Sequence, residues 1–184
     1  MPPRPTLIVV SGPPGSGKTT LAHEIARAVG CPAICRDEIK EGMAHATPGF
    51  VPQPGDELTM RTLPTFFGVL ELLLTAGVTT VAEAAFQDRI WHPHLAPLLP
   101  LACIRIVHCT VDPQMAFQRI IRRGQASAAR AAHADPGLDG AADYIQRHLA
   151  FDRVSLDAPF IEVDTTSGYH PGIDQIATFI NSSP

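Results

Sequence analysis

The chain has 184 residues, of which 45% are apolar and 17% carry a charge. That length fits one ordinary domain, which needs no disulfide or metal ion to hold it together. The composition excludes a disordered chain, because the apolar share is high and the net charge is only −4. With 14 basic and 18 acidic residues, the chain also lacks the strong positive charge of a general nucleic-acid coat protein.

The sequence contains no pattern typical of secretion or of a membrane span. Pro5 leads directly into a short apolar run that ends at Val10, which is unlike a secretory signal. The apolar run Leu70–Leu74 contains Glu71 and stops at Gly77, well short of the roughly 20 apolar residues that cross a bilayer. The four cysteines match neither the redox nor the usual zinc spacing. We therefore expect a soluble cytoplasmic protein with reduced thiols.

Short apolar runs alternate with helical periodicity along the chain. Apolar, often β-branched runs predict strands at 6–10, 33–35, 78–82, 104–108 and 160–163. Helical spacing of apolar residues, with capping and stop residues, predicts helices at 21–30, 37–43, 57–76, 112–121, 144–151 and 173–180. The helix at 57–76 is expected to be interrupted, or to restart, at Pro64. This alternation indicates an α/β fold with a parallel sheet covered by helices on both faces.

Three stretches lack a clear pattern. Residues 45–55 are rich in Pro and Gly and predict a loop. Residues 95–101 contain two prolines and predict a short helix or an irregular segment. Residues 124–140 are small and polar, and we expect this segment to be mobile.

The segment Gly12–Thr19 has the spacing Gly-x4-Gly-Lys-Thr and lies between the first predicted strand and the first predicted helix. Its glycines let several backbone N–H groups point at a phosphate, and the helix N-terminus adds about half a positive charge there. In such a loop Lys18 reaches the terminal phosphates, and the Thr19 hydroxyl ligates the magnesium ion bound to them. The sequence therefore predicts a nucleotide site. Its expected contacts come from Gly12, Pro13, Pro14, Gly15, Ser16, Gly17, Lys18, Thr19 and Thr20.

With this loop and this order of elements, the chain resembles the small P-loop kinases, a group that includes adenylate kinase, gluconate kinase, chloramphenicol phosphotransferase, the zeta toxins and the 5′-kinase domain of polynucleotide kinase. The resemblance extends over most of the chain, and Gly12–Thr19 is its specific part. It implies a single P-loop domain over residues 1–184, with a five-stranded parallel sheet in the order 2-3-1-4-5. It also implies a short lid at 124–140, with ATP and Mg²⁺ as cofactors.

In this group an Asp just after the second strand often contacts the acceptor hydroxyl, and Asp37 stands there with Arg36 before it. A loose phosphoryl transition state mainly requires positioning, so this carboxylate would orient the hydroxyl and take its proton late. Asp37 is therefore the candidate catalytic base. The alternative is that Asp37 only caps the helix that it begins, in which case Glu38 is the rival carboxylate. Arg36 is either a ligand of a substrate anion or a surface residue.

The group usually carries an acidic residue at the end of the third strand, and Glu83 follows that strand here. The carboxyl end of the strand would place Glu83 beside the phosphate loop, where it can hold a magnesium-bound water. The usual residue at this point is Asp, so the longer side chain is a departure. A substrate-facing role and a simple strand-end charge are the alternatives. Gln87, Asp88 and Arg89 are further candidates for the acceptor pocket.

Arg119, Arg122 and Arg123 fall at positions i, i+3 and i+4 if the helix that begins at Asp112 continues through them, which puts Arg119 and Arg123 one turn apart on the same face. The similarity to adenylate kinase implies an adenine-stacking role for Arg119 and a phosphate contact for Arg123. Arg130 would close over the γ-phosphate from the lid, and the loop that contains Thr165 would pack beside adenine. The alternatives are a solvated basic face for the arginines and an ordinary turn at Thr165.

We therefore expect an ATP-dependent kinase that transfers the γ-phosphoryl group to a hydroxyl of a small molecule. Its catalytic residues would be Lys18, Asp37, Arg123 and Arg130, with Thr19 and Glu83 at the metal. A nucleic-acid 5′-hydroxyl kinase is one alternative, which the net negative charge and the small number of aromatic residues disfavour. A regulatory ATPase without an acceptor is the other. Neither the acceptor nor the oligomeric state follows from the sequence.

Overall fold

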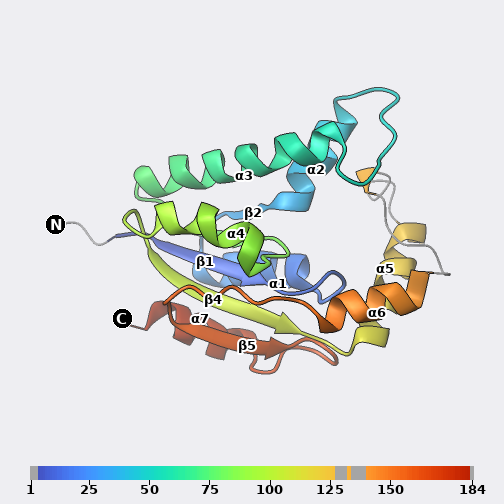
Figure 1. The fold of residues 1–184 in the computed structure, drawn as a ribbon. Helices are drawn as coiled ribbons and strands as arrows, with labels where there is room; N and C mark the ends of the chain where they lie inside the picture. The colour runs from blue at the N-terminus through green and yellow to red at the C-terminus, as the bar shows by residue number, and fades with distance from the viewer. Residues whose placement is uncertain (1–3, 127–131, 134–139, 183–184) are drawn as a thin grey trace.

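The computed structural model describes residues 4–126, 132–133 and 140–182 (Figure 1). Its five strands form one parallel sheet in the order β2-β3-β1-β4-β5, which confirms the predicted fold class and strand order. The strands are β1 (Thr6–Ser11), β2 (Ala33–Cys35), β3 (Thr80–Glu83), β4 (Cys103–Thr110) and β5 (Phe160–Asp164).

Helices connect these strands in the described part of the chain. They are α1 (Lys18–Val29), α2 (Arg36–His45), α3 (Glu57–Thr75), α4 (Asp88–Leu95), α5 (Pro113–Ala126), α6 (Ala141–Leu149) and α7 (Ile173–Asn181), with a 3-10 turn, η1 (Ala96–Leu98), after α4. Strand β3 begins at Thr80, two residues later than the predicted start at residue 78. Val78 and Thr79 precede it, and the Thr79 hydroxyl accepts a hydrogen bond of 3.0 Å from the backbone N–H of Thr6.

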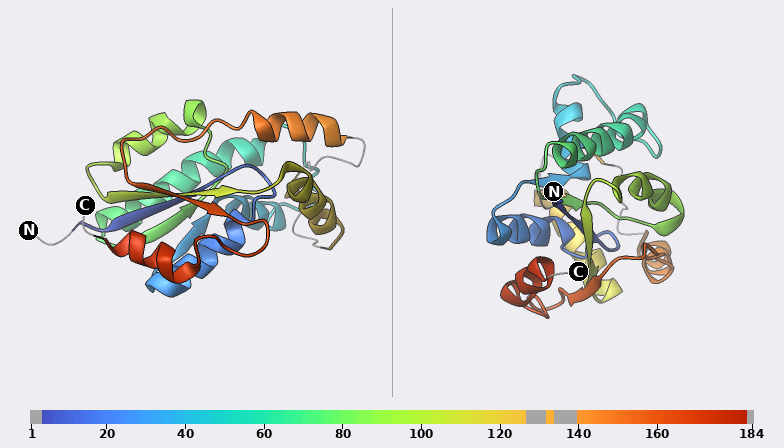
Figure 2. Two further views of the ribbon diagram at one scale, coloured as in Figure 1. Left: turned by 90° about the horizontal axis from the view of Figure 1, so that it is seen from below. Right: turned by 90° about the vertical axis from the view of Figure 1, so that its left-hand side faces the viewer.

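Alternate residues of the central strand β1 enter two separate cores. Leu7 and Val9 pack with α3, α4 and η1 on one face, whereas Ile8 and Val10 pack with α1 and α7 on the other (Figure 1 and Figure 2). All four side chains are fully buried. A strand buried on both faces requires a continuous apolar run, which is the pattern that the sequence shows at 6–10.

The expected break at Pro64 is wrong, because α3 runs without interruption from Glu57 to Thr75. Pro64 lies on the exposed side of the helix, while Phe66, Leu70 and Leu74 are buried against the sheet. Burial of that apolar side offsets the hydrogen bond that proline cannot donate. Within the described residues, α3 is also a helix long and apolar enough to cross a membrane by length and composition, contrary to the sequence expectation. One side of α3 packs in the core, whereas its other side is exposed at residues such as Leu72.

The proposed lid at 124–140 lies mostly outside the described residues. Its first three residues, 124–126, belong to the last turn of α5. Helix α6 begins directly after it and packs beside α5 and near the carboxyl ends of β1 and β4 (Figure 1). The described lid neighbours thus lie at the edge of the sheet that carries the phosphate loop.

Candidate active site

The phosphate loop fits tightly between β4 and α5. Gly15 and Gly17 have φ angles of 76° and 77°, in the left-handed region, and Gly17 caps α1. A Cβ atom on Gly15 would lie 2.4 Å from the carbonyl oxygen of Ala116, and one on Gly12 would lie 2.6 Å from that of Cys109. Glycine is therefore needed here both for backbone conformation and for close approach.

The donors that surround this loop suit a bound phosphate. The first N–H groups of α1 have no partner within the helix, so they are available to an anion at its N-terminus. The hydroxyl of Ser16 is fully buried and has no hydrogen-bond partner among the described residues. A buried hydroxyl in that position costs free energy unless a ligand satisfies it. These features fit the polyphosphate of a nucleotide.

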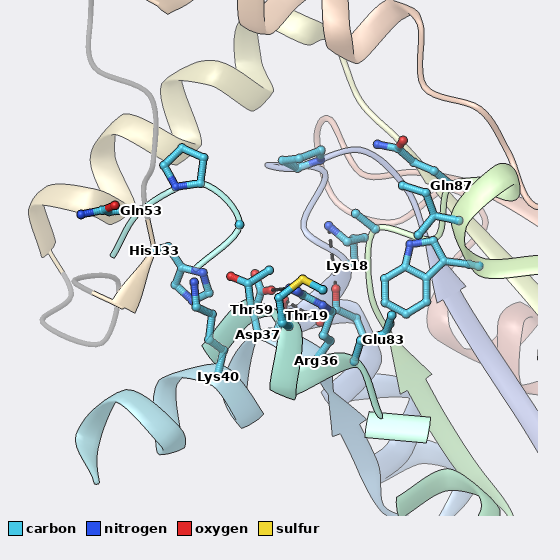
Figure 3. Close-up of a pocket in the computed structure, with 18 of the residues that line it drawn as sticks. Lys18, Thr19, Arg36, Asp37, Lys40, Gln53, Thr59, Glu83, Gln87 and His133 are labelled. Carbon is cyan, nitrogen blue, oxygen red and sulfur yellow. Dashed lines mark hydrogen bonds and ion pairs between the residues drawn. The ribbon is translucent and has the colours of Figure 1, made fainter. Parts of the chain in front are cut away.

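Lys18, Thr19 and Glu83 meet at the carboxyl end of β3 (Figure 3). The Thr19 hydroxyl donates a hydrogen bond of 3.1 Å to Glu83 Oε2, and Lys18 Nζ lies 3.8 Å from Glu83 Oε1. Lys18 Nζ also donates to the carbonyl oxygen of Pro13 at 3.3 Å. Adjacent oxygen ligands of an octahedral Mg²⁺ lie about 2.9 Å apart, given metal–oxygen distances of about 2.05 Å. The spacing of the Thr19 and Glu83 oxygens therefore fits a shared magnesium ion.

Glu83 is only 3% exposed, which is unusual for a carboxylate. Burial raises its pKa, and the negative charges of Asp37 and Glu38 raise it further, whereas Lys18 and the Thr19 hydroxyl act in the opposite direction. The protein thus holds a carboxyl whose charge is poorly compensated by its own side chains. A divalent cation beside Glu83 would supply the missing compensation.

Asp37 does not cap α2, which excludes the alternative that it serves only as a helix cap. The helix begins at Arg36, its N-cap residue is Cys35, and Asp37 lies in the first turn. Strand β2 ends at Cys35, directly before the helix, and the Cys35 side chain makes no capping hydrogen bond. Arg36 Nη1 donates to Asp37 Oδ1 at 3.1 Å. Glu38 points elsewhere, with its Oε1 2.7 Å from His23 Nε2.

A cavity of about 530 Å³ adjoins the loop, and Asp37 lines it together with Lys18, Thr19 and Glu83 (Figure 3). The wall opposite is partly apolar and includes Met60, Leu63, Ile90 and Trp91. Polar side chains of the remaining wall include Arg36, Lys40, Gln53, Thr59 and Gln87. Arg89, predicted beside Asp37 in the acceptor pocket, is exposed and is not among the described lining residues.

The sequence interpretation missed a buried ion pair at this cavity. Lys40 Nζ lies 2.9 Å from Asp56 Oδ2, and the side chains of the pair are only 5% and 8% exposed. Asp56 also caps α3 by accepting a hydrogen bond of 2.7 Å from the N–H group of Thr59, and it accepts another of 3.2 Å from the N–H group of Gln53 in the preceding loop. Helical spacing offered a signal, because Lys40 lies one turn after Arg36 and so shares its face.

Two residues that were predicted to lie beside the nucleoside, Arg119 and Thr165, contact each other. Arg119 donates to the carbonyl oxygens of Thr165, at 2.8 Å, and Thr166, at 3.0 Å. Thr165 is buried, and its hydroxyl donates to the carbonyl oxygen of Ser16 at 2.7 Å. Arg123, two turns from Ala116 on α5, is exposed and lines the cavity. Arg130 lies outside the described residues, so its role stays a prediction.

Tyr144 of α6 makes a second contact that the sequence did not indicate, with the phosphate loop. Its hydroxyl donates to the carbonyl oxygen of Pro14 in the phosphate loop and lies 3.3 Å from His148 Nδ1. His148 Nε2 lies 3.2 Å from the carbonyl oxygen of Val111. No local sequence pattern predicts a contact between two residues that are 130 positions apart. The result is a direct link between α6 and the loop.

Comparison with known proteins gives one family match and several structures of similar fold. The family model AAA_33, described as an AAA domain, matches residues 7–143. No curated protein matches the chain. The fold is similar to that of a protein assigned as a kinase in Chloroflexus aurantiacus, with a TM-score of 0.84 and 20% identity over 96% of this chain and 97% of that chain.

Two further structures share the fold. A sugar kinase from Janibacter sp. HTCC2649 matches with a TM-score of 0.63 and 22% identity, over 99% of this chain and 97% of that chain. A chain of the Pnkp1/Rnl/Hen1 RNA repair complex matches with a TM-score of 0.59 and 16% identity, over 83% of this chain and 48% of that chain. At these identities the likeness shows the fold alone.

Proposed function

The chain belongs to the AAA_33 family, and from that membership and the geometry of the cavity we propose that it is an ATP-dependent kinase. It transfers the γ-phosphoryl group of ATP to a hydroxyl group of a small molecule, with Mg²⁺. The resemblance to small P-loop kinases is confirmed at the level of family and fold. The transfer reaction and its acceptor are the proposal.

One observation carries the proposal: Asp37 lines the same cavity as Lys18, Thr19 and Glu83. A nucleotide-binding switch needs the phosphate loop and a metal site, but it does not need a carboxylate across a pocket from the phosphates. A kinase needs that arrangement, because its acceptor must lie between the γ-phosphate and a group that orients the hydroxyl. The proposed acceptor site is therefore the cavity between Asp37 and the loop.

The proposed roles follow from position and charge. The loop N–H groups and Lys18 hold the phosphates, and Arg123 adds positive charge at the same cavity. Thr19 and Glu83 hold Mg²⁺, directly or through water, and this ion would neutralise charge on the phosphates. Asp37 accepts a hydrogen bond from the acceptor hydroxyl and then its proton, while a hydrogen bond from Arg36 Nη1 to Oδ1 holds the Asp37 carboxylate in place. Arg119 and Thr165 would contact the nucleoside.

The cavity favours a small acceptor over a polynucleotide. Its volume of about 530 Å³ lies within the roughly 300–1,000 Å³ range of small-molecule sites. Trp91 and Ile90 offer an apolar surface, and Gln53, Thr59 and Gln87 offer hydrogen bonds that could read hydroxyl groups. The net charge of −4 gives no general attraction for a phosphate backbone.

A transfer assay tests the proposal. The protein would be incubated with ATP labelled at the γ-phosphate, Mg²⁺ and a panel of sugars, sugar acids, nucleosides and hydroxylated antibiotics, with a 5′-hydroxyl oligonucleotide at low salt as a further acceptor. We expect label on at least one small molecule, and none with Lys18→Ala. Labelled 5′ ends that decline steeply with added salt would instead identify a nucleic-acid kinase. Release of inorganic phosphate alone, unchanged by any acceptor, would identify an ATPase.

A further inference from the structure

Three side chains that can ligate a metal ion converge at the start of α2, and none of them has a role in the proposed transfer. His23 comes from α1, Cys35 ends β2, and Glu38 lies in the first turn of α2. One ligand atom from each lies within 4.8 Å of the other two. We propose that His23, Cys35 and Glu38 form a binding site for a thiophilic divalent cation, of which Zn²⁺ is the natural candidate.

The distances within this cluster resemble those of a tetrahedral zinc site. His23 Nε2 lies 3.7 Å from Cys35 Sγ and 2.7 Å from Glu38 Oε1. With a Zn–S bond of about 2.3 Å and a Zn–N bond of about 2.05 Å, a tetrahedral ion separates sulfur and nitrogen by about 3.6 Å. The same geometry separates nitrogen and oxygen by about 3.3 Å. The ion therefore requires Glu38 to move outward by about half an ångström, which an exposed side chain can do.

One ligand of the cluster is buried and two are exposed, so an ion could enter the site from solvent. The Cys35 residue is 2% exposed, whereas the side chains of His23 and Glu38 are 45% and 46% exposed. The thiol forms the base of the site, the two exposed ligands form its sides, and water would complete the tetrahedron from outside. When the cation binds, the sulfur–metal bond replaces the S–H bond, and the proton leaves to solvent.

The chemistry of the ligands separates this site from the magnesium position. Thiolate and imidazole select Zn²⁺ and related ions, whereas the hydroxyl and carboxylate of Thr19 and Glu83 select Mg²⁺. The two positions are close, because Cys35 and Glu83 are paired in register on neighbouring strands. Burial and the nearby carboxylates of Glu83 and Glu38 raise the pKa of the Cys35 thiol, so the thiol would lose its proton together with the binding of a dication, which those carboxylates attract.

An occupied site would join α1, β2 and α2 at the point where α2 begins. Because the ion binds the folded arrangement and not the unfolded chain, it should stabilise the protein. This effect does not depend on any kinase activity. It can be measured in the full chain without nucleotide.

Cobalt substitution tests the site, because Co²⁺ bound to a thiolate has a charge-transfer absorption that Co²⁺ bound only to nitrogen and oxygen lacks. Chelator-treated, reduced protein would be titrated with Co²⁺ in the presence of excess Mg²⁺. We expect one equivalent to give the thiolate band, and Zn²⁺ to displace it. Cys35→Ser should abolish the band. His23→Ala and Glu38→Gln, at exposed positions, should weaken Co²⁺ affinity by at least about tenfold.

Cys31→Ser is the matched control, because Cys31 is a free, partly buried cysteine that precedes the same strand. It should keep the band and the affinity. Zn²⁺ should raise the melting temperature of the wild type and of Cys31→Ser but not that of Cys35→Ser. The proposal is overturned if the wild type gives no thiolate band, if Cys35→Ser retains it, if excess Mg²⁺ removes it, or if both exposed variants bind Co²⁺ as tightly as the wild type.

Discussion

The Thr19 hydroxyl on α1 donates a hydrogen bond of 3.1 Å to Glu83 Oε2 at the end of β3, although the two residues are 64 positions apart. Thr19 is the second residue of its helix, and Glu83 is the last of its strand. Parallel pairing of β1 with β3 brings them together, because Val10 and Glu83 are in register. The two residues predicted to hold magnesium are thus adjacent before any ion is bound.

Glu83→Gln should raise the Mg²⁺ concentration needed for half-maximal turnover by at least about tenfold, because the amide carries no charge for the ion. Affinity for ATP without Mg²⁺ should change little. Magnesium titrations of turnover, beside calorimetry in chelator, measure the two effects. The exposed Glu71→Gln on α3 is the control for loss of one carboxylate. An unchanged magnesium requirement would mean that Glu83 has no part in metal binding.

Lys18→Ala should abolish ATP-dependent turnover and weaken ATP binding, because the β- and γ-phosphates lose their charge partner. The fold should survive, since Glu83 is 3.8 Å from Lys18 and can take up a proton when the ammonium group is absent. Calorimetry with ATP and a circular dichroism melt check the two parts. Equal ATP affinity in the variant and the wild type would contradict the proposed role of Lys18.

Asp37→Asn should lower phosphoryl transfer by about 10²–10⁴-fold, the usual contribution of a general base, and change ATP affinity by only a few-fold. Because Asp37 does not cap α2, this variant should have little effect on the melting temperature. Glu38→Gln is the comparison that discriminates between the two carboxylates. If it caused the larger loss of turnover, Glu38 would be the base and Asp37 would not.

Arg119→Ala should weaken ATP binding by about tenfold, which corresponds to about 1.4 kcal/mol and lies within the range of a cation–π contact. If Arg119 stacks on adenine, binding of inorganic tripolyphosphate should be unaffected, because it lacks the base. Calorimetry with both ligands separates the two effects. The exposed Arg122→Ala serves as the control for loss of one positive charge on α5. A parallel loss for both ligands would place Arg119 at the phosphates instead.

Asp56→Asn should destabilise the protein at neutral pH by about 3–5 kcal/mol, because it leaves the buried Lys40 ammonium without its counter-charge. Burial acts to raise the pKa of Asp56, but hydrogen bonds from Lys40, Thr59 and Gln53 outweigh it and hold that pKa well below its usual range.

The pH dependence of that difference has a definite sign. A carboxyl with a lowered pKa in the folded state stabilises the protein above its ordinary pKa of about 4, and this contribution is lost as the pH falls toward the lower folded value. The gap between wild type and Asp56→Asn should therefore shrink below about pH 4. Urea denaturation of both proteins from neutral to acid pH measures it. A gap that stays constant with pH would show that the ion pair is not its source.

The sequence predicted the phosphate loop and the five strands because both depend on local patterns, whereas the strand order came from the resemblance to small P-loop kinases. Gly12–Thr19 carries its spacing within eight residues, and apolar β-branched runs identify strands buried on both faces. The start of α2 was harder to predict, because a capping side chain is the usual sequence signal and Cys35 is not a capping residue. Helix α3 continues through Pro64 because Phe66 and Leu70 are buried in the core. The low helix propensity of proline contains no information about that burial.

Contacts between distant segments could not be read from the chain. The Lys40–Asp56 pair depends on how α2 and α3 pack, and the Tyr144–Pro14 hydrogen bond depends on where α6 returns to the sheet. No short pattern in the sequence indicates that the members of either pair are in contact. Asp37, Lys18 and Glu83 were predicted separately, but the shape of the cavity between them follows from the same packing.

The close approach of Gly15 to Ala116 also fixes where α5 lies along its axis relative to the phosphate loop. Arg119 and Arg123 lie three and seven residues beyond Ala116, so helix geometry sets them about 4.5 Å and 10.5 Å along the axis from that point. Removing one residue between Ala116 and Arg119 would turn both guanidinium groups by about 100° around the axis while the loop itself stayed unchanged. The spacing of α5, as much as the identity of its arginines, therefore determines which atoms of a bound nucleotide they can reach.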